Sequence, residues 1–159
     1  MIDAKFVLFT IVPYLVATTF PQTANQLLSL SISVPEQTVR IGSEVKVKTN
    51  LTNITDHVLN FYDANRDCDY PVEVLDDKRN SAPETVYKRQ LRCNQGLSDG
   101  KIENVTLKPH ESRQDEIVVT RFYDLTRPGR YFVQVLRKIP KELGQGTVKS
   151  NILTITVTE

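Results

Sequence analysis

The sequence predicts an all-β protein, an antiparallel β-sandwich of about seven to nine strands. Short segments alternate apolar and polar residues and are rich in β-branched side chains, which is typical of half-buried strands. Clusters of Gly, Pro, Asn and Asp separate these segments at short intervals, and no segment of useful length has a helical period. With 159 residues, the chain is long enough for one domain with its own core.

The alternation is clearest near the start of the expected domain. In "LLSLSISV", residues 27–34, every second side chain is apolar, and "SEVKVKTNLTN", residues 43–53, repeats this pattern. Further strands are expected at residues 57–63, 70–76, 84–90, 115–123, 129–138 and 150–158. Many short strands joined by turns favour a sandwich over other all-β arrangements.

The N-terminus resembles an export signal. An apolar run begins at Phe6, directly after Lys5, and small residues follow it up to Ala24. This order is typical of a secretory signal peptide, and an uncleaved membrane anchor is the alternative. We expect residues 1–24 to be a cleaved signal peptide and residues 25–159 to be a single domain. The mature protein would then be secreted or periplasmic, with no membrane span.

The chain contains two cysteines, Cys68 and Cys93. In an oxidising compartment such a pair most often forms a disulfide, and two separate buried thiols are the alternative. The bridge would close a loop of about 25 residues and contribute roughly 3 to 4 kcal/mol.

The charge balance excludes some classes of partner. Lys and Arg total 20 and Asp and Glu total 19, a net charge of +1, so nothing favours nucleic acid or an anionic membrane. We expect the partner to be a protein or an extracellular polymer. No cofactor is expected, because no glycine-rich phosphate loop occurs.

Catalytic motifs are missing from the sequence. No serine lies in G-x-S-x-G, and a disulfide would leave no thiol nucleophile. The two histidines, His57 and His110, lie far apart and lack zinc-ligand spacing to the cysteines. We therefore expect the protein not to be an enzyme.

The weak candidates for a metal site alternate along residues 63–69: Asp63, Asn65, Asp67 and Asp69. This is how an EF-hand calcium loop begins, but such a loop needs glycine at position six and glutamate at position twelve. Cys68 and Val74 occupy those positions. We expect no metal here, and interpret the segment as a polar turn whose side chains splay into solvent. An irregular calcium site is the alternative.

Pro128 and Gly129 predict a turn that leads into a late strand containing Tyr131. The position fits a tyrosine corner, in which the hydroxyl bonds to upstream backbone. A plain core tyrosine is the other reading, and both make Tyr131 structural.

Two surface features each have more than one interpretation. A basic segment could be a recognition surface or a solvated charged face that protects a strand edge: Lys78, Arg79, Lys88, Arg89 and Arg92. Three N-x-[ST] sequons occur, at Asn50, Asn53 and Asn104, and these are acceptors only in a host that glycosylates secreted proteins.

The order of several motifs carries a resemblance: "NLTNITDHVLNF", "YPVEVLDDKRN", "LKPHESRQDEIVV", "LTRPGRYFVQV" and "KSNILTITVT". Over roughly residues 39–158 this layout is similar to bacterial immunoglobulin-like domains, in particular BsuPI-type proteinase-inhibitor domains. The resemblance implies an immunoglobulin-like sandwich and, by analogy, protease inhibition. His110 stands where glycine is usual, which affects a turn, and no inhibitory residue can be carried over.

Together these observations predict a secreted, non-enzymatic β-sandwich module for binding or structural interaction. The alternatives are an extracellular proteinase inhibitor of BsuPI-like type and a calcium-stabilised adhesion-type module.

Overall fold

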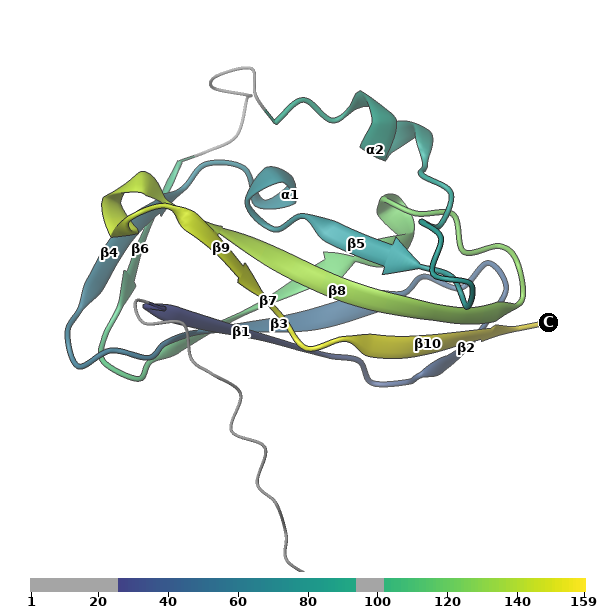
Figure 1. Cartoon of the computed structure of the whole chain (residues 1–159), viewed down its shortest axis with the longest axis horizontal. Helices are drawn as coiled ribbons and strands as arrows, with labels where there is room; N and C mark the ends of the chain where they lie inside the picture. Colours follow the sequence, from purple (N-terminus) through teal and green to yellow (C-terminus); the bar gives the residue numbers. More distant parts are fainter. Residues whose placement is uncertain (1–25, 94–101) are drawn as a thin grey trace, which may run out of the picture.

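Two β-sheets pack against each other, with a two-stranded ribbon at one end (Figure 1). The computed structural model describes residues 26–93 and 102–159. The predicted all-β class, an antiparallel β-sandwich, is confirmed. The predicted signal peptide, residues 1–24, lies outside the described residues. Over the described ranges, no helix is both long and apolar enough to cross a bilayer.

The first layer, called the β7 sheet, has the order β1 (Leu28–Ser33), β3 (Lys46–Asn53) and β7 (Ser112–Val118). The second layer, called the β8 sheet, has the order β2 (Thr38–Arg40), β10 (Leu153–Thr158), β8 (Gly129–Ile139) and β5 (Val72–Leu75). Strand β9 (Gly146–Lys149) also pairs with β8. The ribbon consists of β4 (Leu59–Asp63) and β6 (Glu103–Leu107). Among these named strands, only β2 and β10 pair in parallel.

Four short helical turns join the strands: α1 (Arg66–Asp69), α2 (Val86–Gln90), and the 3-10 turns η1 (Val119–Arg121) and η2 (Lys141–Leu143). Both α1 and α2 lie on the β5 side of the sandwich, above β8 in the view of Figure 1.

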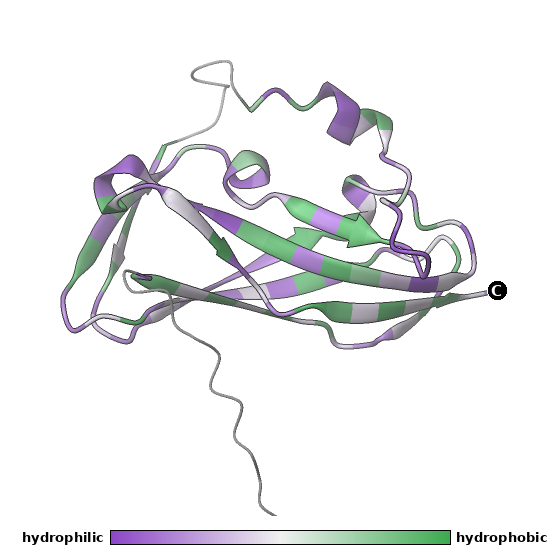
Figure 2. Cartoon of the chain, in the orientation of Figure 1, coloured by the Kyte–Doolittle hydropathy of each residue, from purple (hydrophilic) through white to green (hydrophobic). Residues whose placement is uncertain are grey.

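The core follows the period-two pattern of the strands. Apolar and polar residues alternate along β8 in Figure 2, and the side chains of Tyr131, Val133 and Val135 are buried. Facing them are apolar residues of the other layer, such as Val47 and Leu51 of β3. Burial of these alternating faces is the main favourable term in the stability of a sandwich.

Strand β8 begins at the turn that the sequence predicted. Gly129 has a φ of 152°, in the region that favours glycine. The Tyr131 hydroxyl then donates a hydrogen bond to the carbonyl of Arg127 at 2.9 Å, which is the contact of a tyrosine corner.

The largest error in the predicted elements concerns residues 84–90, expected as a strand. They contain α2, because the Thr85 hydroxyl accepts a hydrogen bond from the Lys88 N–H at 3.2 Å and caps the turn. Strands β2, β6 and β9 were not predicted. The strand expected at 115–123 begins earlier, at Ser112, and gives way to η1 after Val118.

Asn53 is an interior residue with no solvent exposure. Its amide nitrogen donates to the carbonyls of His57 at 2.8 Å and of Leu107 and Lys108 at 3.0 Å each. The end of β3 is thereby bound to the turn between β6 and β7. Of the other two sequon asparagines, Asn50 is half-buried and Asn104 is exposed.

Candidate functional site

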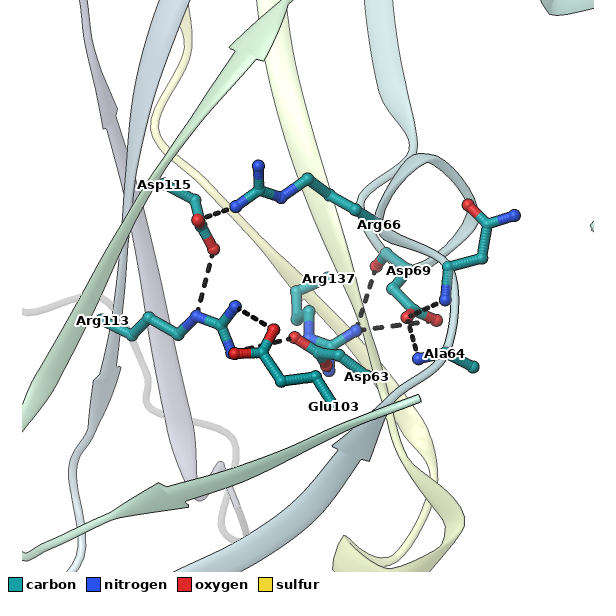
Figure 3. Close-up of polar contacts among 9 residues, drawn as sticks. Asp63, Ala64, Arg66, Asp69, Glu103, Arg113, Asp115 and Arg137 are labelled. Carbon is teal, nitrogen blue, oxygen red and sulfur yellow. Dashed lines mark hydrogen bonds and ion pairs between the residues drawn. The ribbon is translucent and has the colours of Figure 1, made fainter. Parts of the chain in front are cut away.

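Charged side chains from both layers and the ribbon converge at one end of the sandwich (Figure 3). We call this group the ion-pair network: Asp63, Arg66, Asp69, Glu103, Arg113, Asp115 and Arg137. Its members come from β4, α1, β6, β7 and β8, so they hold elements far apart in the sequence.

Arg137 lies at the centre of the ion-pair network. It continues the inward face of β8, and its side chain is only 1% exposed. The guanidinium pairs with Asp63, and it lies 3.8 Å from the Asp69 carboxylate. The Tyr70 ring centroid is 4.7 Å away. A buried guanidinium is tolerated only with such partners, because leaving it unpaired costs several kcal/mol.

Arg113 of β7 extends the ion-pair network to the other layer. Its guanidinium contacts Asp63 at 3.5 Å, Glu103 at 2.8 Å and Asp115 at 3.2 Å. Asp115 in turn pairs with Arg66 of α1. The chain of contacts therefore links β8 and α1 with β7 across the interior.

Burial changes the titration of two groups in this region. Loss of solvent raises the pKa of Asp63 above the ordinary carboxyl value, although Arg137 and Arg113 act in the opposite direction. Burial likewise raises the pKa of Tyr70. The guanidinium groups favour the ionised form of Asp63, and the bonds they make are cross-links between elements.

The structure places the four weak metal candidates in different roles. Asp63 is buried in the ion-pair network, so the expectation that it splays into solvent is wrong. The Asn65 side chain accepts from the Asp67 N–H and caps α1. Asp69 accepts from the Ala64 and Asn65 N–H groups, both at 3.1 Å.

Asp67 completes the set and points toward α2. It accepts a hydrogen bond from the Tyr87 hydroxyl and pairs with Arg121 at 3.2 Å. The four side chains thus bind arginines, a tyrosine and backbone N–H groups. In the part of the chain that the structure describes, no three His, Cys, Asp or Glu side chains gather as metal ligands.

Cys68 and Cys93 form a disulfide, as predicted, with their Cα atoms 5.3 Å apart. Cys68 is buried in α1, so the bridge fastens the segment that ends at Cys93 to the sandwich. We call residues 81–93, which include α2, the ridge. The Tyr87 ring packs edge-on against Phe122, with centroids 5.7 Å apart.

The base of the ridge is held by Lys88. Its ammonium group lies 3.7 Å from the centroid of the Tyr123 ring and 3.1 Å from Glu84. The Tyr123 hydroxyl donates to the carbonyl of Val72 at 3.0 Å, so the same contacts cover the outer edge of β5. Ridge and sheet are therefore joined by a disulfide, ring contacts and hydrogen bonds.

A cleft of about 680 Å³ lies on each side of the ridge. The β5 cleft lies between the ridge and β5, and its lining includes Leu75, Lys88, Leu91, Phe122 and Lys138. The η1 cleft lies between the ridge and the loop after η1, and its lining includes Glu44, Glu84, Val86, Arg89 and Asp124. Val86 lines the η1 cleft and is a large apolar side chain, 60% exposed, at the ridge surface. Concave sites with apolar walls and a few polar or charged groups are the usual places for ligand or partner binding.

The other surface residues singled out in the sequence lie in different parts of the structure. Of the basic segment, Lys88, Arg89 and Arg92 belong to the ridge, whereas the Arg79 guanidinium stacks 4.2 Å from the Phe132 ring centroid. His110 lies 3.4 Å from Asp56 in an exposed contact.

The ion-pair network was not predicted, since Asp63 and Asp69 were considered only as weak metal candidates whose side chains would point into solvent. One signal was available for Arg137, because the inward alternation that gives Val133 and Val135 continues to it. A charged residue at an inward position requires a buried carboxylate partner. Which carboxylate it meets depends on the packing of β4 and α1 against β8.

Comparisons with known proteins found distant structural matches alone. No protein-family model matches the chain, and no curated protein matches it. The solved structures that match include the solution structure of a CARDB domain from Pyrococcus furiosus, at 12% identity and a TM-score of 0.43. That match covers 83% of this chain and 94% of the CARDB domain.

The crystal structure of that CARDB domain in complex with di-metal ions has the same identity and TM-score, and covers 82% of this chain and 87% of that one. A beta-glucosidase from Listeria innocua matches at 16% identity and a TM-score of 0.43. The match covers 83% of this chain but only 16% of the beta-glucosidase. Such similarity carries no argument about activity.

Proposed function

We propose that this protein is a secreted, non-enzymatic β-sandwich module that binds a protein partner through the ridge and the two clefts beside it. The main support for this proposal is that the ridge, an irregular surface segment, is fastened to the sandwich at several points. The disulfide holds its end, and Tyr87 and Lys88 hold its middle. A preorganised surface loses less conformational entropy on binding than a flexible loop does.

The chemistry of the clefts supports a protein partner. The β5 cleft combines apolar walls from Leu91 and Phe122 with the ammonium groups of Lys88 and Lys138. The η1 cleft combines Val86 with the carboxylates of Glu44, Glu84 and Asp124. Mixed apolar and charged linings of this size suit side chains of both kinds, as protein interfaces present them.

The test is capture of a partner from the secreted fraction of the source cells, followed by affinity measurement with the purified partner. We expect Val86→Arg to weaken the measured affinity at least tenfold, because it places a long charged side chain in the wall of the η1 cleft. Lys48→Glu, on the exposed face of β3, is the matched control and should leave the affinity unchanged. Equal affinities for wild type and Val86→Arg would refute the proposed surface.

Protease inhibition of BsuPI-like type is the alternative function. Its support is the sequence resemblance and the basic residues of the ridge. An inhibitor that binds like a substrate presents an extended segment, whereas residues 86–90 are helical. Inhibition of any extracellular serine protease at micromolar concentration would replace the binding proposal with this one.

A calcium-stabilised module is the third possibility. A ligand that binds only the folded state raises the melting midpoint. We expect the midpoint to be the same with calcium and with EDTA, because the candidate carboxylates Asp63, Asp67 and Asp69 already contact arginines. A midpoint that rises with calcium would contradict this expectation.

A further inference from the structure

Strand β7 is an edge of its sheet, and among residues 26–93 and 102–159 no strand pairs with its outer side. Its seven residues pair with β3 on one side only. An edge strand presents a row of N–H and C=O groups that can pair with another strand. The outer edge of β5, by contrast, is covered, since the Val74 carbonyl accepts from the Ala82 N–H at 2.9 Å.

The hydrogen bonds at the two ends of β7 show which residues have backbone N–H and C=O groups that point away from β3. The Val119 N–H donates to the backbone carbonyl of Val45 at 2.8 Å, and the Asn53 N–H donates to the backbone carbonyl of Glu111 at 3.0 Å. Because bonded pairs alternate in an antiparallel ladder, the odd-numbered residues of β7 bond to β3. The backbone groups of the even-numbered residues point away from the sheet: Ser112, Gln114, Glu116 and Val118.

None of these four residues has a backbone hydrogen bond to another described residue. The side chains of Ser112, Gln114 and Glu116 are exposed, so they do not shield a buried surface. The inward side chains, Arg113 and Asp115, belong to the ion-pair network and are only 23% and 15% exposed.

The sequence of β7 is self-complementary when two copies pair antiparallel. In the register centred on Gln114, Arg113 of each copy lies opposite Asp115 of the other. Ser112 of each copy then lies opposite Glu116 of the other, and the central glutamines face each other. Each facing pair of even-numbered residues exchanges two backbone hydrogen bonds, because the N–H and C=O groups of both residues point toward the other copy.

We propose that two copies of this chain associate through β7, in a two-fold dimer whose β7 sheets join into one continuous sheet. The partner is a second copy because oppositely charged residues meet on both sides of the symmetry axis, as an isologous interface requires. The existing contact of Arg113 with Asp115 within one chain is then extended to the second chain.

The competing explanation is that the charges keep the edge single. Inward-pointing charged residues are one means by which proteins prevent strand-to-strand pairing. The two explanations differ in the effect of charge sign on association, so an experiment can separate them.

The first measurement is the mass of the full chain in solution, by sedimentation over concentrations up to about 1 mM. We expect a concentration-dependent shift from monomer to dimer. Gln114→Pro should abolish the dimer, since proline lacks the outward N–H and is tolerated where the N–H faces solvent. Gln114→Ala keeps that N–H and should still dimerise.

Amide exchange checks that Gln114→Pro remains folded. The N–H groups of Arg113 and Asp115 should be protected in the wild-type dimer, and protection at Asp115 should persist in the variant. The outward N–H of Glu116 should be protected in the dimer alone.

Charge sign tests the register. Ser112→Glu places two like-charged pairs against Glu116 of the other copy, and Ser112→Lys places two opposite pairs there. We expect the first to raise the dissociation constant roughly fivefold and the second to lower it by a similar factor. Both variants lose the same contact with Thr52, so they are matched.

The proposal is overturned if the chain stays monomeric at every concentration. It is also overturned if Gln114→Pro dimerises as well as Gln114→Ala does. A dimer that responds equally to Ser112→Glu and Ser112→Lys would exclude this register and with it the proposed interface.

Discussion

The two halves of strand β8 pack by different means. Tyr131, Val133 and Val135 fill an apolar core, whereas Arg137, two residues further on, is equally buried but surrounded by charges. The apolar half is stabilised mainly by non-directional burial, and other apolar side chains of similar volume would fit there. The charged half depends on particular partners, since a buried ion pair is destabilising once one member is lost.

Replacing Arg137 should therefore have the largest effect. We expect Arg137→Met to lower the free energy of unfolding by about 3 kcal/mol, because Asp63 remains buried with only Arg113 beside it, at 3.5 Å. Urea denaturation followed by circular dichroism gives this value.

The double variant Arg137→Met with Asp63→Leu is the control, because it removes both charges from the interior. We expect it to recover most of the lost stability. If the double variant is as unstable as Arg137→Met alone, the cost does not come from an unpaired carboxylate.

In the apolar half, Val133→Ala should lower the free energy of unfolding by roughly 2 kcal/mol. Val133 is fully buried, and the change leaves a small cavity without an unpaired polar group. The same urea denaturation, with Lys138→Ala on the exposed face of β8 as control, measures the effect. A larger loss for Val133→Ala than for Arg137→Met would reverse the comparison.

Tyr131→Phe should have a smaller effect, about 1 kcal/mol, because it removes the single hydrogen bond from the hydroxyl to Arg127. The ring stays in place, so the apolar packing is retained. Thermal denaturation detects a loss of this size as a shift of several degrees. No shift at all would mean that the tyrosine-corner contact contributes nothing.

The smallest expected effect is a dependence on pH in the acid range, where Asp63 of the charged half titrates. The pKa of Asp63 is raised in the folded state, so the folded protein holds this proton more tightly than the unfolded chain. The contribution of Asp63 to stability is then fully present below the ordinary value of 3.8 and decreases as pH rises through the raised pKa. The difference in unfolding free energy between wild type and Asp63→Asn, measured across that range, should follow this trend. A difference that grows with pH would mean that the arginines lower the pKa of Asp63 by more than burial raises it.

The same contrast explains what could be predicted from sequence. The strand expectations at residues 27–34, 43–53 and 129–138 succeeded because period-two alternation is a local property of the chain. The expectation at 84–90 failed because one hydroxyl, that of Thr85, caps a helical turn. Alternation in β6, with Val105 and Leu107 buried, was present but short, and it was not recognised.

The disulfide was predictable because only one pairing exists for two cysteines. The clefts and the ion-pair network were not, since they depend on which segments meet in three dimensions. Asp63 was assigned to solvent from its neighbours in sequence, yet its partner is Arg137, 74 residues away. Long-range pairing of this kind leaves no local pattern in the chain.

The position of β10 has a consequence for how fast the protein folds. This strand lies between β8 and β2, and its contact with β2 joins residues 119 positions apart, as between Thr158 and Val39. Strand β10 pairs with β8 over a short sequence separation, but β2 joins the β8 sheet only after a very large loop has closed, and that closure costs entropy before any bond repays it. We therefore expect refolding on the millisecond-to-second scale, with the β2–β10 pairing among the last contacts to form.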